Sequence, residues 1–323
     1  MTNKEKYREF CKTETDIPIF SKDWWLDAVC PENKYWNVVL VEKGGQIAAS
    51  MPYIIGRKRG FKTIEMPELT QKLGPYIKYP INQKYETKLS YEKEIMTELI
   101  NQIPDVAFFN QNFSYSITNW LPFYWKGFQQ TTKYTYVIED TSDLEKVEAN
   151  FSHAKRKNLK KCKDLLDIVF DIDAKTFYDN HKMTLQKQGQ TISYSFELFN
   201  KIYNSAYNHN SAKTIAAFDK DGNLNSALFI IWDNVSAYDL ISTIDPDYRN
   251  NGSATLLVLE AIKLASQKGL KFDFEGSMIE GVENSFRQFG TVQKPFFTIS
   301  KTYSKLYKLL SLAKDVCRLL GSK

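Results

Sequence analysis

The sequence predicts a mixed α/β fold built from two tandem copies of one unit, and three observations support this prediction. The chain has 323 residues, enough for about two domains. Residues 38–54 and 214–230 each contain two apolar runs joined by a Gly-containing turn, a pattern typical of a β-hairpin. Both halves also end with similar sequences, WKGFQQTTKYTYVI from Trp125 and FRQFGTVQKPFFTI from Phe286.

The elements after each hairpin follow one order: a third strand, a helix, a strand, a short helix and a final strand. Leucines and isoleucines at three- and four-residue spacing predict helices over residues 88–103 and 252–268. Short apolar runs predict the next strands at residues 106–110 and 272–275. Because the hairpins pair locally and the helix serves as a crossover, antiparallel and parallel pairing should occur together.

The boundary between the copies is predicted near residues 139–142, where a strand over residues 134–138 ends. Thr141 or Ser142 is expected to cap the next helix. A helical segment interrupted by a strand at residues 168–172 then precedes the second hairpin. The predicted domains are residues 1–140 and 141–323.

The composition is that of an ordinary folded protein, with 43% hydrophobic and 25% charged residues, which excludes a disordered or collagen-like chain. The four cysteines are scattered and the three histidines stand 28 residues apart, so neither a disulfide framework nor a metal site is predicted. The N-terminal sequence MTNKEKYREF lacks the apolar run of a signal peptide. We therefore expect a cytoplasmic protein.

The net charge of +5 is carried by the C-terminal segment, because residues 301–323 hold six lysines and arginines against one aspartate. A helix is predicted there, and it either packs on its own domain or contacts an anionic membrane at the inner face. The apolar residues predicted to share one face of this helix are Leu306, Leu309, Leu310, Ala313, Val316, Cys317 and Leu320.

A second basic segment, residues 153–163, holds six lysines and arginines and no acid. It includes Arg156 and Lys160, and its apolar residues recur at helical spacing. The cations form either a solvated helix surface or a surface that binds the phosphates of a nucleotide or RNA.

A turn between a predicted strand at residues 237–243 and the long helix reads Arg249-Asn-Asn-Gly-Ser-Ala254. Small residues at a helix N-terminus let backbone N–H groups approach an anion. The segment is therefore either an anion-binding loop, formed by Arg249, Asn250, Asn251, Gly252, Ser253 and Ala254, or an ordinary turn before a helix cap.

Asp273 and Glu275 stand two residues apart in a Phe-rich strand, so both carboxylates should leave the sheet on one face, with Phe272 and Phe274 on the other. Burial and mutual repulsion would raise at least one carboxyl pKa, as suits a general base. The alternative is a structural anchor for the following turn. The first-half strand has no such pair of acids, which favours chemistry in the second half.

Arg287 precedes an aromatic-Gly pair, and a fixed cation there could stabilise an oxyanion or hold a phosphate. The alternative is an ordinary surface arginine. The candidates for protonating a leaving group are Tyr238, Tyr248 and Tyr303.

In their order along the chain, these features resemble the tandem GNAT (acyl-CoA N-acyltransferase) fold of the FemAB-like family. The second half carries the resemblance in RNNGSA from Arg249, FDFEGS from Phe272 and FRQFG from Phe286. The first-half strings that resemble the family's substrate-side domain are WWL from Trp24, MPY from Met51 and QKLGP from Gln71. The basic segment resembles the family's linker helix.

The resemblance implies an acyltransferase, because the family includes peptidoglycan aminoacyltransferases and envelope-polysaccharide acyltransferases. In GNAT enzymes the segment similar to Arg249–Ala254 holds the pyrophosphate of coenzyme A, whereas Fem-type enzymes take the acyl group from transfer RNA. The resemblance thus leaves acyl-CoA and aminoacyl-tRNA both open as donors. It places donor binding and catalysis in the second domain and the acceptor, with Trp24 and Gln71, in the first.

The predicted function is transfer of an acyl or aminoacyl group to an amine of a nucleotide- or lipid-linked envelope precursor, with no metal and no DNA partner. Asp273 or Glu275 would manage the proton, Arg287 would offset negative charge, and Arg156 and Lys160 would attract an anionic substrate. The alternative is a non-catalytic module that binds a nucleotide sugar or RNA.

Overall fold

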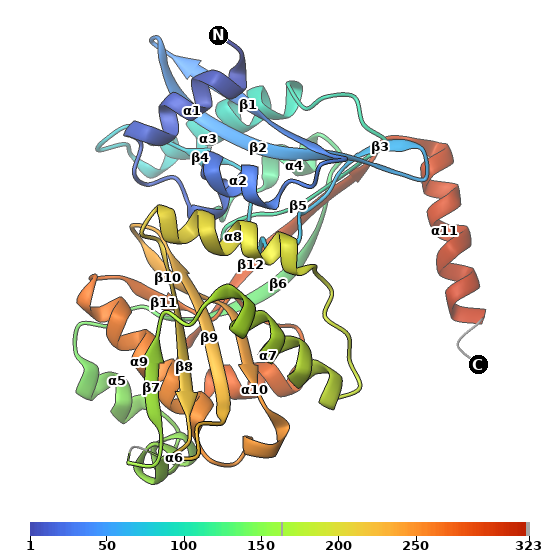
Figure 1. The fold of residues 1–323 in the computed structure, drawn as a ribbon. Helices are drawn as coiled ribbons and strands as arrows, with labels where there is room; N and C mark the ends of the chain where they lie inside the picture. Colours follow the sequence, from blue (N-terminus) through green and yellow to red (C-terminus); the bar gives the residue numbers. More distant parts are fainter. Residues whose placement is uncertain (163, 321–323) are drawn as a thin grey trace. The chain divides into compact units, whose positions relative to one another are not determined.

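A computed structural model describes residues 1–162 and 164–320, with side chains described up to residue 313 (Figure 1). The chain forms two compact units. The first comprises residues 1–132 together with the chain from Phe296 onward, and the second comprises residues 133–295. The chain passes from one unit to the other within β6 (Gln129–Ile138) and again within β12 (Val292–Thr302).

The first unit contains a mixed sheet with the strand order β1-β2-β3-β5-β12, and β4 pairs with β2. The β1–β2 hairpin is antiparallel, whereas β3 and β5 are parallel and joined through α3. The elements are α1 (Asn3–Thr13), η1 (Ile19–Ser21), α2 (Asp23–Val29), β1 (Tyr35–Lys43), β2 (Gln46–Lys58), β3 (Phe61–Ile64), β4 (Tyr76–Ile77), α3 (Tyr85–Asn101), β5 (Phe108–Asn112), α4 (Leu121–Trp125) and α11 (Lys305–Leu320).

The second unit contains a mixed sheet with the strand order β6-β11-β10-β9-β8-β7. The β8–β9 hairpin is antiparallel, and β10 and β11 are parallel and joined through α9. The elements are α5 (Leu144–Asn150), α6 (His153–Cys162), β7 (Asp167–Phe170), α7 (Ala174–Lys187), α8 (Phe196–Asn208), β8 (Ala212–Phe218), β9 (Leu224–Trp232), β10 (Ser236–Ile244), η2 (Pro246–Tyr248), α9 (Ser253–Gln267), β11 (Lys271–Asp273) and α10 (Glu280–Arg287).

Both faces of the second sheet are covered by helices. Leu228 and Ile230 of β9 share one buried core with α9. Phe229 lies between them and faces the other way, because neighbouring strand residues point to opposite faces. Its ring lies 6.1 Å from that of Phe177 in α7 and 5.4 Å from that of Phe199 in α8. The sheet is therefore enclosed between α9 and the α7–α8 pair.

The predicted repeat of elements is confirmed. Hairpin, third strand, helix, strand and short helix occur as β1–β2, β3, α3, β5 and α4 in the first half. They recur as β8–β9, β10, α9, β11 and α10 in the second half. The mixture of antiparallel and parallel pairing is also as predicted.

The closing strands show where the compact units differ from the predicted division at residue 140. β6 closes the first copy in sequence, but its residues Val137 and Ile138 pair with β11 in the second unit. β12 closes the second copy, and its residues Thr298 to Thr302 pair with β5 in the first unit. The chain from Phe296 onward therefore belongs to the first unit, because a strand joins the sheet whose hydrogen bonds it completes.

The helix after the predicted boundary is capped by Asp143, whose side chain accepts the backbone N–H of Lys146 at 3.0 Å. The prediction of Thr141 or Ser142 as the cap is wrong. The Thr141 hydroxyl donates to the carbonyl of Leu270 at 2.6 Å, and Ser142 donates to a neighbouring aspartate. The helix begins at Leu144, so the residue directly before it, Asp143, is the one whose side chain reaches the free N–H groups of the first helical turn.

Candidate functional site

Asp273 lies at the end of β11, in register with Tyr238 of β10 and Val137 of β6. Its side chain is fully buried, at 0% exposure. One carboxylate oxygen, Oδ1, accepts the hydroxyl of Thr135 and, at 2.9 Å, the backbone N–H of Glu275. The carboxylate therefore holds the turn after β11. This is the structural role that the sequence analysis gives as the alternative to a general base.

Glu275 lies in that turn and not in the strand. β11 ends at Asp273, and Glu275 and Gly276 have φ values of 61° and 75°. The two-residue alternation of a strand therefore does not extend to Glu275, contrary to the prediction. Glu275 is nevertheless only 7% exposed, so two carboxylates are buried within one short segment.

The turn requires glycine at position 276. A Cβ atom there would lie 2.2 Å from the carbonyl oxygen of Tyr134, and the positive φ is disfavoured for a residue with a side chain. The phenylalanines of the same segment are placed as predicted: Phe272 and Phe274 are buried in the α9 core, with ring centres 5.0 Å apart.

Tyr238 lies next to Asp273 and forms a hydrogen bond with a further acid, Asp233. Its hydroxyl donates to Oδ2 of Asp233 at 2.9 Å. Burial raises the pKa of Tyr238 well above its usual value, and the negative charges of Asp233, Asp273 and Glu275 raise it further. Of the three tyrosines singled out in the sequence, Tyr238 is therefore the one that the second unit places beside Asp273.

Asp239, the next residue of β10, is a candidate that the sequence analysis missed. The register of β10 with β9 shifts between Asp239 and Ile241, and pairing of β10 with β11 ends at Tyr238. The Asp239 carboxylate is 5% exposed and accepts the Ser242 hydroxyl, which lies 2.7 Å from each carboxylate oxygen. Burial raises the pKa of Asp239 to about 6. A carboxyl group with this pKa, beside an irregularity in the sheet, has the properties of a general base.

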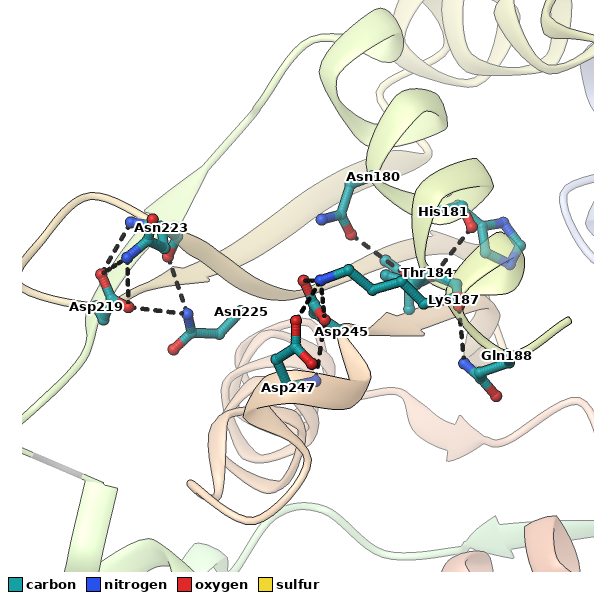
Figure 2. A network of polar contacts seen from close by, with 11 residues as sticks. Asn180, His181, Thr184, Lys187, Gln188, Asp219, Asn223, Asn225, Asp245 and Asp247 are labelled. Carbon is teal, nitrogen blue, oxygen red and sulfur yellow. Dashed lines mark hydrogen bonds and ion pairs between the residues drawn. The ribbon is translucent and has the colours of Figure 1, made fainter.

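A polar network fixes the turn between β10 and α9 from the side of α7 (Figure 2). Lys187 lies at the end of α7, and its ammonium contacts the carboxylates of Asp245 at 2.8 Å and Asp247 at 2.6 Å. One turn earlier in α7, the hydroxyl of Thr184 lies 2.7 Å from that of Thr243 in β10. These contacts join the end of α7 to the end of β10 and to η2.

The predicted anion-binding turn is itself internally bonded. The Asn251 side chain accepts the backbone N–H of Ser253 at 2.9 Å and donates to the Asn225 side chain at 2.7 Å. Gly252 adopts a φ of 89°, and a Cβ there would lie 2.9 Å from the carbonyl oxygen of Asn158 in α6. The Ser253 N–H is thus already satisfied, whereas Arg249 and Asn250 are exposed. Ala254, in the first turn of α9, is half-buried.

Arg287 is not brought to the acids by any contact among the described residues. Its guanidinium donates to the Asn284 side chain at 2.9 Å and lies 3.7 Å from the Glu283 carboxylate, and the side chain is 62% exposed. The neighbouring Phe286 and Phe289 pack against Phe274 in the α9 core. Across the described residues, no group of three histidine, cysteine, aspartate or glutamate side chains is placed to hold a metal ion.

The basic segment forms α6, and its cations differ in their surroundings. Arg156 donates from Nη1 to the carbonyls of Ala149, at 2.6 Å, and Phe151, so it holds the end of α5. Lys160 is exposed to solvent. Lys163 lies outside what the structure describes, as does the side chain of Cys317 further along the chain.

Lys155 was not singled out in the sequence, yet it is the half-buried cation of α6. Its ammonium donates to the Ser285 hydroxyl at 3.1 Å and lies 4.2 Å from the centre of the Phe289 ring. Burial lowers the pKa of Lys155 to about 8. The position of Ser285 and Phe289 on and after α10 could not be read from the sequence of α6.

In the first unit, Trp24 is half-buried in α2. Gln71 is also half-buried, and its backbone carbonyl accepts the Asn112 side chain at 3.0 Å. The neighbouring Lys72 is only 5% exposed, and its ammonium lies 5.1 Å from the centre of the Tyr115 ring. A buried lysine in the QKLGP segment is a second candidate that the sequence analysis did not single out.

No model of a known protein family matches the sequence, and no curated protein matches it. Solved structures do match. FemX superposes with a TM-score of 0.69 at 11% identity, over 92% of this chain and 96% of FemX. The C-terminal domain of a putative lysylphosphatidylglycerol synthetase from Agrobacterium fabrum gives a TM-score of 0.57 at 13% identity, over 98% of this chain and 97% of that domain.

L-PGS from Bacillus licheniformis gives a TM-score of 0.56 at 10% identity, over 99% of this chain and 97% of that structure. At such identities, the matches establish the fold and leave the chemistry to be argued from the residues. Over nearly its whole length, the chain has the tandem GNAT-like fold that its resemblance to the FemAB-like acyltransferases predicts, and it shares this fold with FemX.

Proposed function

We propose that this chain is an acyltransferase that moves an acyl or aminoacyl group onto an amine of a peptidoglycan or polysaccharide precursor. The observation that carries the proposal is the pair of acids buried at the end of β11, Asp273 and Glu275; Asp239 is a third buried acid, on the opposite face of β10 from Tyr238, the strand partner of Asp273. Burying a carboxylate destabilises the folded protein unless the group is hydrogen-bonded, and buried carboxyl groups with shifted pKa values are common at functional sites. The pair lies in a fold shared with FemX.

The reaction needs one proton acceptor and one proton donor. The amine nitrogen attacks the acyl carbonyl carbon, a C–N bond forms, and the C–S bond of a thioester or the C–O bond of an aminoacyl ester breaks. Asp273 or Glu275, directly or through water, would take the proton that the amine loses, and Asp239 is a further candidate because its pKa is about 6. Tyr238 remains protonated near neutral pH and would supply a proton to the departing thiolate or alkoxide.

The donor would lie along the turn from Arg249 to Ala254. Since Asn251 already bonds the Ser253 N–H, the exposed Arg249 and Asn250 are the groups most accessible to a donor phosphate. Acyl-CoA and aminoacyl-tRNA both carry such phosphates. Arg287 and Lys160 are exposed cations that would attract the anionic donor over longer range.

The acceptor would be held by the first unit, through Trp24, Gln71 and Lys72. The buried ammonium of Lys72 suits an anionic acceptor such as a nucleotide- or lipid-linked precursor. The test is turnover with a panel of acyl-CoAs and aminoacyl-tRNAs, each offered with amine-bearing envelope precursors. The proposal expects one donor class to give a covalent product detectable by mass spectrometry, and no product from any donor would refute it.

A second candidate function is a non-catalytic module that binds a nucleotide sugar or RNA through α6. The exposure of Lys157, Lys160 and Lys161 on that helix favours it. Such binding should weaken steeply as salt rises, because phosphate contacts release counterions. RNA affinity measured at two salt concentrations, combined with the turnover panel, separates the two functions.

A further inference from the structure

The C-terminal helix α11 is attached to the first unit through its first turn. Tyr307 is 5% exposed, and its ring stacks on that of Phe108, with centres 5.5 Å apart. The ring of Phe61 meets it edge-on at 5.6 Å. The contacts hold one side of α11 against β3 and β5, so the side opposite Tyr307 faces away from them.

The side of α11 that is centred about 110° around the helix from Tyr307 carries a stripe of exposed leucines. Leu306, Leu309 and Leu310 are 57%, 64% and 42% exposed, and Leu312 beside them is 53% exposed. At 100° per residue, Leu306, Leu309, Leu310 and Ala313 span about 100° of the helix surface. The side chains of Val316, Cys317 and Leu320, which the sequence assigns to the same stripe, lie outside those the structure describes. A contiguous exposed apolar stripe indicates a partner.

Cations lie beside the stripe and identify the chemistry of that partner. α11 contributes the exposed Lys305 and Lys308, and no acid occurs in the helix up to residue 313. At the end of the β2–β3 hairpin Arg57, Arg59 and Lys62 are exposed; Arg57 and Lys62 pair across the two strands on the sheet face opposite Phe61, and Arg59 lies in the turn itself. This turn lies next to α11, because Arg59 donates to the Ser311 hydroxyl at 3.5 Å.

We infer that the leucine stripe of α11 lies in the surface of an anionic lipid bilayer, with the cations of α11 and of the β2–β3 turn contacting lipid phosphates. Apolar residues flanked by lysine and arginine are the pattern of helices that lie in a membrane interface. A helix that pairs with another helix usually carries both signs of charge beside its stripe, and that mixture does not occur in residues 305–313. Within the described part of the chain, no helix is long and apolar enough to cross a membrane.

This inference goes beyond the proposed transfer reaction and does not depend on it. It would hold the enzyme where lipid-linked substrates are found. Sedimentation of the full chain with vesicles of neutral lipid, and with vesicles containing 30% phosphatidylglycerol, tests it without any measure of activity. Binding to the anionic vesicles alone, decreasing as salt rises, is the expected result.

Two variants identify the contacts. Replacing Lys305, Lys308 and Arg59 with glutamine should weaken binding to the anionic vesicles by about a hundredfold. Replacing Leu306, Leu309 and Leu310 with serine should weaken it by about tenfold or more. Matched controls remove three exposed lysines of α7 and α8 (Lys175, Lys182 and Lys201) or three exposed leucines elsewhere (Leu89, Leu121 and Leu165), and they should bind like the wild type.

Absence of binding by the wild type, or unchanged binding by both variants, overturns the inference. It is equally overturned if sedimentation velocity finds a dimer that the leucine variant abolishes, because a second copy of the chain would then cover the stripe. Circular dichroism of each variant establishes that the fold is retained.

Discussion

Asp239 gives a prediction that depends on the structure and not on any assumed substrate. The carboxylate is 5% exposed and is bonded by the Ser242 hydroxyl. Asp239→Asn removes the ionisable group but keeps an oxygen that can accept this hydroxyl. The variant therefore isolates the cost of burying the negative charge, and the folded protein should become more stable at high pH.

The size and sign of the effect follow from the two pKa values. Folding raises the pKa of Asp239 from 3.8 to about 6, so between these values the folded state binds more protons than the unfolded state, and wild-type stability falls as pH rises. The complete penalty above pH 7 is about 3 kcal/mol, at 1.36 kcal/mol per pKa unit. About half of it is already present at pH 5. The stability of Asp239→Asn relative to wild type should therefore increase by about 1.5 kcal/mol from pH 5 to pH 8.

Urea unfolding followed by circular dichroism at pH 5 and pH 8 measures this difference. Asp140→Asn is the control, because hydrogen bonds from Ser142 lower the pKa of Asp140 and its ionised form is complete at both pH values. Its effect on the free energy of unfolding should be the same at both. A relative stability of Asp239→Asn that is equal at pH 5 and pH 8, or larger at pH 5, would contradict a raised pKa of Asp239 in the folded protein.

Three further predictions concern other parts of the second unit. Gly276→Ala should lower the free energy of unfolding by about 2 kcal/mol or more, because of the contact with Tyr134 and the positive φ, and unchanged urea unfolding would contradict this. Lys187→Met should lower the free energy of unfolding and speed amide hydrogen exchange at the start of α9, since the buried Asp245 loses its cation; unaltered exchange there would count against the network. In the NMR spectrum of the reductively ¹³C-methylated protein, Lys155 should titrate near pH 8, and a midpoint above pH 10 would show that its ammonium is not desolvated.

Local patterns in the sequence were enough to predict the order of elements. The Gly-containing turns located both hairpins, and helical spacing located α3 and α9 to within three residues of their bounds at Tyr85–Asn101 and Ser253–Gln267. Strand ends were displaced as well, since the predicted strand at 272–275 ends at Asp273 in the structure. A strand end depends on the partner strand, which no local pattern specifies.

Long-range pairing explains what the sequence did not reveal. The exchange of β6 and β12 between the units depends on hydrogen bonds to β11 and β5, elements remote in sequence. Asp239 was missed because an aspartate in a strand carries no sign of its burial. Asn251 and Arg156 were placed in candidate binding surfaces, but their hydrogen bonds also give them structural roles that depend on Asn225 and on the end of α5.

In the proposed reaction, buried acids of the second unit handle the proton of an attacking amine. The most direct measurement is the single-turnover rate of acyl transfer, with the donor found by the panel, for wild type and for Asp273→Asn, Glu275→Gln and Asp239→Asn. At least one of these variants should lose about a hundredfold or more in rate while remaining folded. Rates equal to wild type in all three would contradict it.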